Sequence, residues 1–262
     1  MPWLREFDIP LAIAIPIDGD ASSVASALAK AFPDGIDIDD PDAGRVTGHI
    51  AVKQLVETSD QWLLDGGARI ERGAVTVGDH RTVAEFDVHL ARDGAPFILP
   101  LAVAVEHEAS GRSAAIRIYY SHWPLLGRHV IRPPLLAPDP TARESDVVGR
   151  YQAALAAGDA NAITATFEDD GCFREPAGPQ YRVCGRGDLR EFFAGFFAMG
   201  GGILLEHCTV TEDGVRTALE FNAVRWGSVD MPHQAGIAVY ERGPTGRLAY
   251  ARIYDDVDPP LD

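Results

Sequence analysis

The pattern of hydrophobic residues in the second half of the chain predicts three helices. Two short segments rich in alanine, Val147–Ala157 and Ala160–Phe167, are separated by Gly158-Asp159, which favours a break between two helices. In a third segment the large apolar side chains recur at intervals of three and four residues: Leu189, Phe192, Phe193, Phe196 and Phe197. This spacing places them on one face of a helix, which we expect to pack against a core.

After Gly200-Gly201-Gly202 the pattern changes to strands. Four runs, separated by turn sequences, fit this interpretation: Ile203–Val210, Arg216–Arg225, Gly236–Glu241 and Leu248–Asp255. Helices followed by a meander predict an α+β fold, in which a curved antiparallel sheet wraps over helices. In the first half only Ala21–Phe32 is predicted as helix, before an Asp- and Gly-rich turn at Pro33–Asp42.

The two halves of the chain are copies of one another. At a constant offset of 135 residues, short matches recur: Arg81–Phe86 with Arg216–Phe221, Gly111-Arg112 with Gly246-Arg247, and Arg117–Tyr119 with Arg252–Tyr254. A repeat of this length is a whole domain. The proline-rich stretch at 131–142 cannot form a helix or a central strand, which predicts a linker. We therefore expect one domain at 1–130 and a second at 143–262.

Composition narrows the classes of function. The formal net charge of −16 disfavours binding to nucleic acid or to a membrane surface. Three cysteines, Cys172, Cys184 and Cys208, lack CxxC spacing, which argues against a disulfide framework and a zinc site. Eight histidines show no paired ligand spacing, so we expect no metal and no cofactor. The first residues lack the pattern of a signal peptide, and a reduced, cytoplasmic protein is the simplest interpretation.

Several motifs of the second copy resemble a known superfamily. Arg150-Tyr151, Gly158-Asp159, Glu175-Pro176 and the run Gly185–Phe193 are similar, in order and spacing, to the pattern of ketosteroid isomerases. Gly246–Leu248 and Ala251–Asp256 are similar to the last hairpin of SnoaL-like proteins. The chain thus resembles a tandem duplication of the superfamily that also includes nuclear transport factor 2. The resemblance implies two cone-shaped domains, each with an apolar interior that suits a small apolar ligand.

The resemblance also implies candidate catalytic residues. Glu175 occupies the place of the isomerases' catalytic aspartate, and Tyr151 that of their oxyanion-stabilising tyrosine. A carboxyl group in an apolar wall has a raised pKa and can serve as a general base. The alternative is that Glu175 is a surface residue in a turn before proline. In the first copy, Asp40 and Glu71 lie at the positions equivalent to Glu175 and Glu206, but no tyrosine matches Tyr151, which favours a degenerate first copy.

Glu206 is a further candidate because alternation in Ile203–Val210 groups it with Leu204, Cys208 and Val210. Fused epoxide-opening cyclases of polyether biosynthesis, which resemble this chain, use an Asp and a Glu at matching places. Glu206 would then donate a proton to an epoxide. A glutamate at the rim, or paired with an arginine, is the alternative. Five aromatic residues are expected to line the pocket: Phe173, Phe192, Phe196, Trp226 and Tyr254.

Two functional hypotheses follow. The first is a cofactor-free acid–base enzyme that acts on an apolar small molecule, in the class of isomerases, polyketide-type cyclases or epoxide-opening enzymes. The alternative is a non-catalytic protein of the same fold that binds a small molecule or serves as a scaffold. Single-domain members of the superfamily dimerise through the sheet, which implies an intramolecular pseudo-dimer here, or a homodimer of the whole chain.

Overall fold

A computed structural model describes residues 21–65, 67–92, 94–108, 110–144, 146–198, 200–258 and 260. The start of the chain, where a signal peptide was not expected, lies outside the described residues. The chain divides into two compact units, Met1–Tyr120 and Ser121–Asp262, and each is described by itself. Within the part of the chain that the structure describes, no helix is long and apolar enough to cross a membrane.

The first unit combines two helices with a six-stranded sheet. Its elements are α1 (Ala21–Ala31), β1 (Gly35–Asp40), β2 (Gly44–Thr47), α2 (His49–Asp65), β3 (Arg69–Val77), β4 (Arg81–Arg92), β5 (Ala95–His107) and β6 (Ser113–Tyr119). The strands are ordered β2-β1-β6-β5-β4-β3, and the pairs are antiparallel except for β1 with β6.

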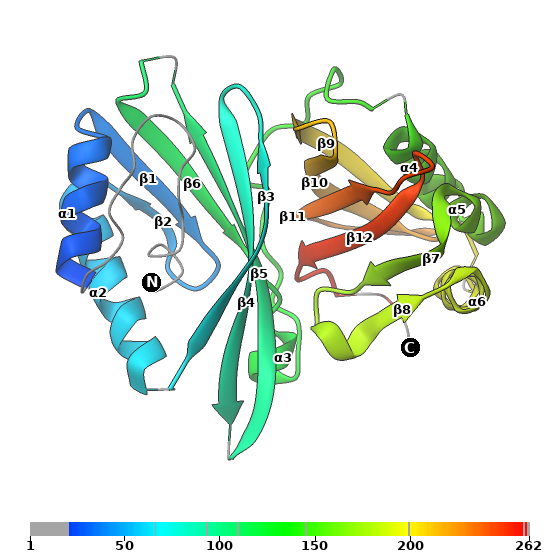
Figure 1. The fold of residues 1–262 in the computed structure, drawn as a ribbon, viewed down its shortest axis with the longest axis horizontal. Helices are drawn as coiled ribbons and strands as arrows, with labels where there is room; N and C mark the ends of the chain where they lie inside the picture. Colours follow the sequence, from blue (N-terminus) through cyan, green and yellow to red (C-terminus); the bar gives the residue numbers. More distant parts are fainter. Residues whose placement is uncertain are drawn as a thin grey trace. The chain divides into compact units, whose positions relative to one another are not determined.

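The second unit repeats this arrangement with additional helices. Its elements are α3 (Trp123–Leu126), α4 (Val147–Ala157), α5 (Ala160–Thr166), β7 (Phe167–Arg174), a 3-10 turn at Pro179–Tyr181, β8 (Arg182–Cys184), α6 (Arg186–Phe196), β9 (Ile203–Glu212), β10 (Arg216–Trp226), β11 (Val229–Arg242) and β12 (Leu248–Asp255). The order of the strands is β8-β7-β12-β11-β10-β9, and only β7 with β12 is parallel. Figure 1 shows α4, α5 and α6 on one side of this sheet.

The identical strand order of the two sheets fits the predicted duplication and confirms the α+β class. Each sheet also contains a hairpin that the sequence did not predict, β1–β2 and β7–β8, and α2 was missed as well. The turn predicted at Pro33–Asp42 is in part the strand β1. β1 and β7 contain several aspartates, which are depleted in strands in general, and parallel pairing with β6 or β12 overrides that propensity. β2 and β8 are only four and three residues long.

The expectation of unpaired cysteines is wrong for two of the three. Cys172 and Cys184 face each other across the β7–β8 hairpin and form a disulfide, whereas Cys208 is a buried free thiol. The spacing of 12 residues carries no recognisable motif, because the proximity of the two cysteines depends on the hairpin register. The argument for a reducing compartment therefore loses its basis.

The apolar stripe of α6 forms the core of the second unit as predicted. Leu189 and Phe193 are fully buried, and the neighbouring rings pack around them. The helix α5 packs against both α6 and α4. α4 is capped at its start by Asp146, whose carboxylate accepts a hydrogen bond from the Val148 amide at 2.8 Å. Gly158 ends α4 in the left-handed conformation (φ 68°) that favours glycine. These helices hold aromatic side chains against the bent sheet.

Candidate functional site

A cavity of about 120 Å³ lies in the second unit between the helices and the sheet. Its wall is formed by 17 side chains, most of them apolar: His129, Tyr151, Leu155, Phe173, Glu175, Pro176, Phe193, Phe196, Ile203, Leu205, Phe221, Ala223, Trp226, Tyr240, Ile253, Asp255 and Val257. An engineered apolar cavity of about 150 Å³ accepts benzene, so this cavity suits a molecule, or part of one, about the size of a single ring.

Two irregularities in the pairing of β10 help to shape this cavity. The register of β10 shifts between Ala223 and Arg225 against both neighbouring strands, and again next to Phe221 against β9. Such bulges bend a strand and increase its twist. Phe221, Ala223 and Trp226 all lie on the cavity wall, and the indole Nε1 of Trp226 donates to the carbonyl oxygen of Phe196 at 3.4 Å. The bend therefore closes the sheet toward α6.

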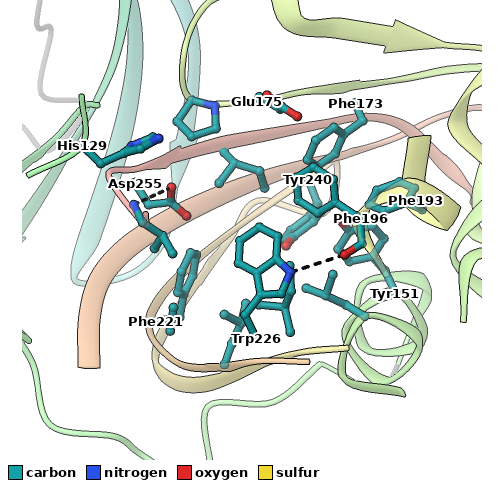
Figure 2. A pocket seen from close by; sticks show the side chains of 17 residues that line it. His129, Tyr151, Phe173, Glu175, Phe193, Phe196, Phe221, Trp226, Tyr240 and Asp255 are labelled. Carbon is teal, nitrogen blue, oxygen red and sulfur yellow. Dashed lines mark hydrogen bonds between the residues drawn. The ribbon is translucent and has the colours of Figure 1, made fainter. Parts of the chain in front are cut away.

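Two carboxyl groups interrupt the apolar wall. Glu175 follows the end of β7, and Asp255 ends β12, where alternation brings Ile253, Asp255 and Val257 to the cavity. Figure 2 shows Glu175, Asp255 and His129 along the upper and left edge of the cavity, with the aromatic side chains below and to the right. The charge of Glu175 acts on Asp255, and the charge of His129 acts on both carboxyl groups, so the three side chains are electrostatically linked.

Burial sets the protonation of these groups. It raises the pKa of Asp255 to about 7, and the charges of Asp256 and Glu175 add to the effect, whereas the Val257 amide and His129 oppose it. Burial also raises the pKa of Glu175, against the opposing charge of His129. Burial raises the pKa of the fully buried Tyr151 well above its usual value, so its hydroxyl stays protonated and can donate a hydrogen bond. Near neutral pH the site thus holds a carboxylic acid beside a carboxylate.

Because the pKa of Asp255 is raised, we expect its ionisation to make the stability of the fold depend on pH. Because its folded-state pKa lies above the usual value near 3.9, its ionisation destabilises the fold as pH rises from about 4 to 7. Replacing Asp255 with asparagine should therefore raise the free energy of unfolding by about 2 kcal/mol at pH 8, after allowance for its partial exposure, and by little at pH 4. Urea unfolding of both proteins at the two pH values measures this difference, and an equal effect at both would contradict it.

The structure brings together some of the residues that the sequence proposed and separates others. Tyr151, Glu175, Phe173, Phe196 and Trp226 all line the cavity. Phe192 lies behind the wall, with its ring 5.3 Å from that of Phe173 and 4.7 Å from that of Phe196. Tyr254 lies on the opposite side of β12 from Asp255, where the Arg174 guanidinium packs 4.8 Å from the centre of its ring.

Glu206 lies outside the cavity. Ile203 and Leu205 of β9 line the wall, so alternation turns Glu206 to the other side of the strand. Its side chain is 41% exposed and 3.7 Å from Nδ1 of His233. The alternation along β9 predicted that the face of Leu204, Glu206 and Cys208 points to the interior, but the residues of β9 that line the cavity are Ile203 and Leu205. The expected inward face was therefore shifted by one residue.

The candidates of the first unit do not form a comparable pair. The Asp40 carboxylate accepts hydrogen bonds from the amides of Asp42 and Ala43, both at 2.9 Å, and thus caps the β1–β2 turn. Glu71 is 60% exposed, and its contacts with Arg69 and His89 lower its pKa. Neither carboxylate has the apolar surroundings that raise the pKa of Glu175.

Two residues of the site were missed by sequence reasoning. Asp255 belongs to a motif that was noted only for its resemblance, although alternation with Ile253 could have indicated its orientation. His129 lies in the segment before the expected linker, and no periodicity relates it to the cavity. Its place depends on how that segment folds against β12.

Comparison with protein families supports this description. Residues 148–251, which all lie in the second unit, match the model of the SnoaL-like domain family. This match agrees with the resemblance to SnoaL-like proteins that the motifs of the second copy showed. No relative is found among curated protein sequences.

Similar solved structures each align with about two fifths of the chain. An uncharacterised cystatin-fold protein from Novosphingobium aromaticivorans is 20% identical, with 41% of this chain and 93% of that chain covered and a TM-score of 0.35. The epoxide hydrolase/cyclase-like enzyme SalBIII, with a role in pyran ring formation in the polyether salinomycin, is 21% identical (42% and 87% covered, TM-score 0.35). An LEH-like epoxide hydrolase from M. tuberculosis is 19% identical (42% and 80% covered, TM-score 0.36).

Proposed function

We propose that the second unit is a cofactor-free acid–base enzyme acting on a small apolar molecule that carries an oxygen function, as isomerases, polyketide-type cyclases and epoxide-opening enzymes do. The observation that supports this proposal is the pair of carboxyl groups, Glu175 and Asp255, on the wall of an otherwise apolar, aromatic cavity. Buried carboxyls with separated pKa values are the usual means of performing acid and base chemistry at one pH.

The roles follow from the protonation states. Glu175, whose pKa is raised by burial but lowered in part by His129, is the base that removes a proton from the substrate. Asp255, with a pKa of about 7, is the acid that donates to the substrate oxygen. Tyr151 supplies a further donor from helix α4. The aromatic side chains exclude water and hold the apolar part of the substrate.

The test uses small probes that fit the cavity. Purified protein is incubated in D2O with cyclohexanone, cyclohex-3-en-1-one or cyclohexene oxide, and NMR follows deuterium uptake beside the carbonyl, migration of the double bond and formation of the diol. Catalysis of any of these above the buffer rate supports the proposal. Binding without any reaction, detected by quenching of Trp226 fluorescence relative to Trp226→Phe, would instead support a non-catalytic binding protein.

Three further expectations remain predictions from the sequence. These are the pseudo-dimeric association of the two copies, a homodimer of the whole chain, and a cytoplasmic location. The role of the first copy as a degenerate partner likewise remains a proposal, for which the exposed Glu71 and the turn-capping Asp40 are the supporting observations.

A further inference from the structure

The segment that precedes the expected linker, residues 121–130, is held against the end of β12 by hydrogen bonds to a single buried carboxylate. Asp256, with a side chain only 2% exposed, accepts four hydrogen bonds from this segment. The donors are Ser121 Oγ at 2.7 Å, His122 Nδ1 at 2.6 Å, His129 Nδ1 at 3.0 Å and the Val130 amide at 2.8 Å. Because Asp256 follows Asp255 directly, the segment is held beside the cavity.

His129 is the member of this group that reaches the cavity. Its ring lines the wall together with Asp255 and Glu175, and it packs against the Trp123 indole at 5.0 Å between ring centres. Nδ1 is engaged with Asp256, and Nε2 has no hydrogen-bond partner among the described residues. The contact with Asp256 thus fixes the orientation of the ring and leaves Nε2 available to a ligand.

The surroundings favour the protonated ring. Burial by itself would lower the pKa of His129, but the hydrogen bond to Asp256 and the charges of Asp256, Asp258 and Asp255 outweigh it and raise the pKa. Glu175 adds a further negative charge across the cavity. The other histidine on Asp256, His122, lies in the same group but not on the cavity wall.

We propose that His129, which lies outside the SnoaL-like match at 148–251, is a catalytic residue of the second unit's site. The inference rests on the proposed function. With Nδ1 bound to Asp256, His129 donates from Nε2–H to the substrate oxygen, alongside Asp255. When Glu175 takes a proton from the carbon next to a carbonyl group, the C–H electron pair forms the enol double bond. The carbonyl oxygen receives its proton from Asp255 while the Nε2–H group of His129 holds a hydrogen bond to it, and the reverse transfers restore Glu175 and Asp255.

A protonated His129 offsets an unfavourable electrostatic interaction in the site. Negative charge that develops on a substrate oxygen between two carboxyl groups is unfavourable, and a positively charged donor removes that penalty. The position of His129 also means that the segment before the linker completes the site of the second copy. A fragment that begins at residue 143 would lack this donor.

The test compares His129→Gln with His122→Gln. Both variants remove one imidazole from Asp256, but only the first changes the cavity wall, so His122→Gln controls for loss of the Asp256 contacts. Each protein is assayed for deuterium exchange into cyclohexanone from pH 5 to 9, at a temperature where urea unfolding shows it to be folded. In a second measurement, NMR of 15N-labelled histidine follows Nε2 of His129 in the wild type as cyclohexanone is added.

We expect His129→Gln to lower kcat/KM by about 10²-fold and to move the alkaline limb of the pH profile upward, because Asp255 loses a neighbouring positive charge. His122→Gln should retain the wild-type kinetics, and the Nε2 resonance should shift on ligand binding. Equal kinetics for His129→Gln and wild type would overturn the inference while leaving the proposed function intact. If the wild type catalyses none of the three probe reactions, the proposed function fails; an Nε2 resonance that does not move at saturating cyclohexanone overturns this inference separately.

Discussion

Replacing Asp255 with asparagine is expected to lower the rate of deuterium exchange by about 10²–10⁴-fold, the usual effect of removing a positioned acid or base. Asparagine keeps the size of the side chain and the contact with the Val257 amide, which the aspartate carboxylate accepts at 3.4 Å. It removes the proton that Asp255 carries below its pKa of about 7. The loss should therefore appear in kcat/KM without loss of the fold.

The pH profile adds a second criterion. In the wild type the rate should fall as pH decreases, because Glu175 becomes protonated, and as pH rises through about 7, because Asp255 loses its proton. The limb near pH 7 should be absent in Asp255→Asn. Glu175→Gln should lower the rate by a similar factor, and Asp40→Asn, at the equivalent position of the first copy, should leave it unchanged. A large loss with Asp40→Asn would show that the first copy works as well.

The fold could be predicted because the sequence patterns that indicate it are local and recur in both halves of the chain. The stripe from Leu189 to Phe197 and the strand runs after Gly202 match α6, β9, β10 and β12 closely, whereas the predicted run at 236–241 covers only the later part of β11. The constant offset between Arg81–Phe86 and Arg216–Phe221 then extends the same sheet order to the first unit. β1 and β7 escaped detection because they pair in parallel with the distant strands β6 and β12, and β2 and β8 because they are only four and three residues long.

The site was predictable only in part, for a different reason. Glu175 and Tyr151 came from a spacing that resembles a known family, and both line the cavity. The side chain of Glu206 was assigned to the wrong face of β9. In a strand with alternating polar and apolar residues, a shift of one residue exchanges the inward and outward faces. His129 could not be inferred, since the segment that carries it is held beside the cavity by four hydrogen bonds to one distant carboxylate.

The same carboxylate should dominate the stability of the second unit. Asp256→Asn is expected to lower the free energy of unfolding by about 3–5 kcal/mol, the usual cost of breaking a buried ionic contact by removing one partner. Four donors converge on this carboxylate, and an asparagine can accept at only one oxygen. Urea unfolding monitored by fluorescence measures the change. The neighbouring Asp258→Asn, at an exposed position, removes the same charge and should change stability by less than about 0.5 kcal/mol.

The pH dependence identifies the ionic origin of the effect. The contacts hold the pKa of Asp256 far below its usual value near 3.9, so its contribution is present above about pH 4 and is lost as pH falls further. The pKa of His129 is raised above its usual value near 6.5, so its contribution is full below that pH and is lost as pH rises through the folded-state pKa. The difference between wild type and Asp256→Asn should therefore be largest between about pH 4 and 6.5. A difference below about 1 kcal/mol throughout this window would mean that packing, and not this carboxylate, holds His129 beside the cavity.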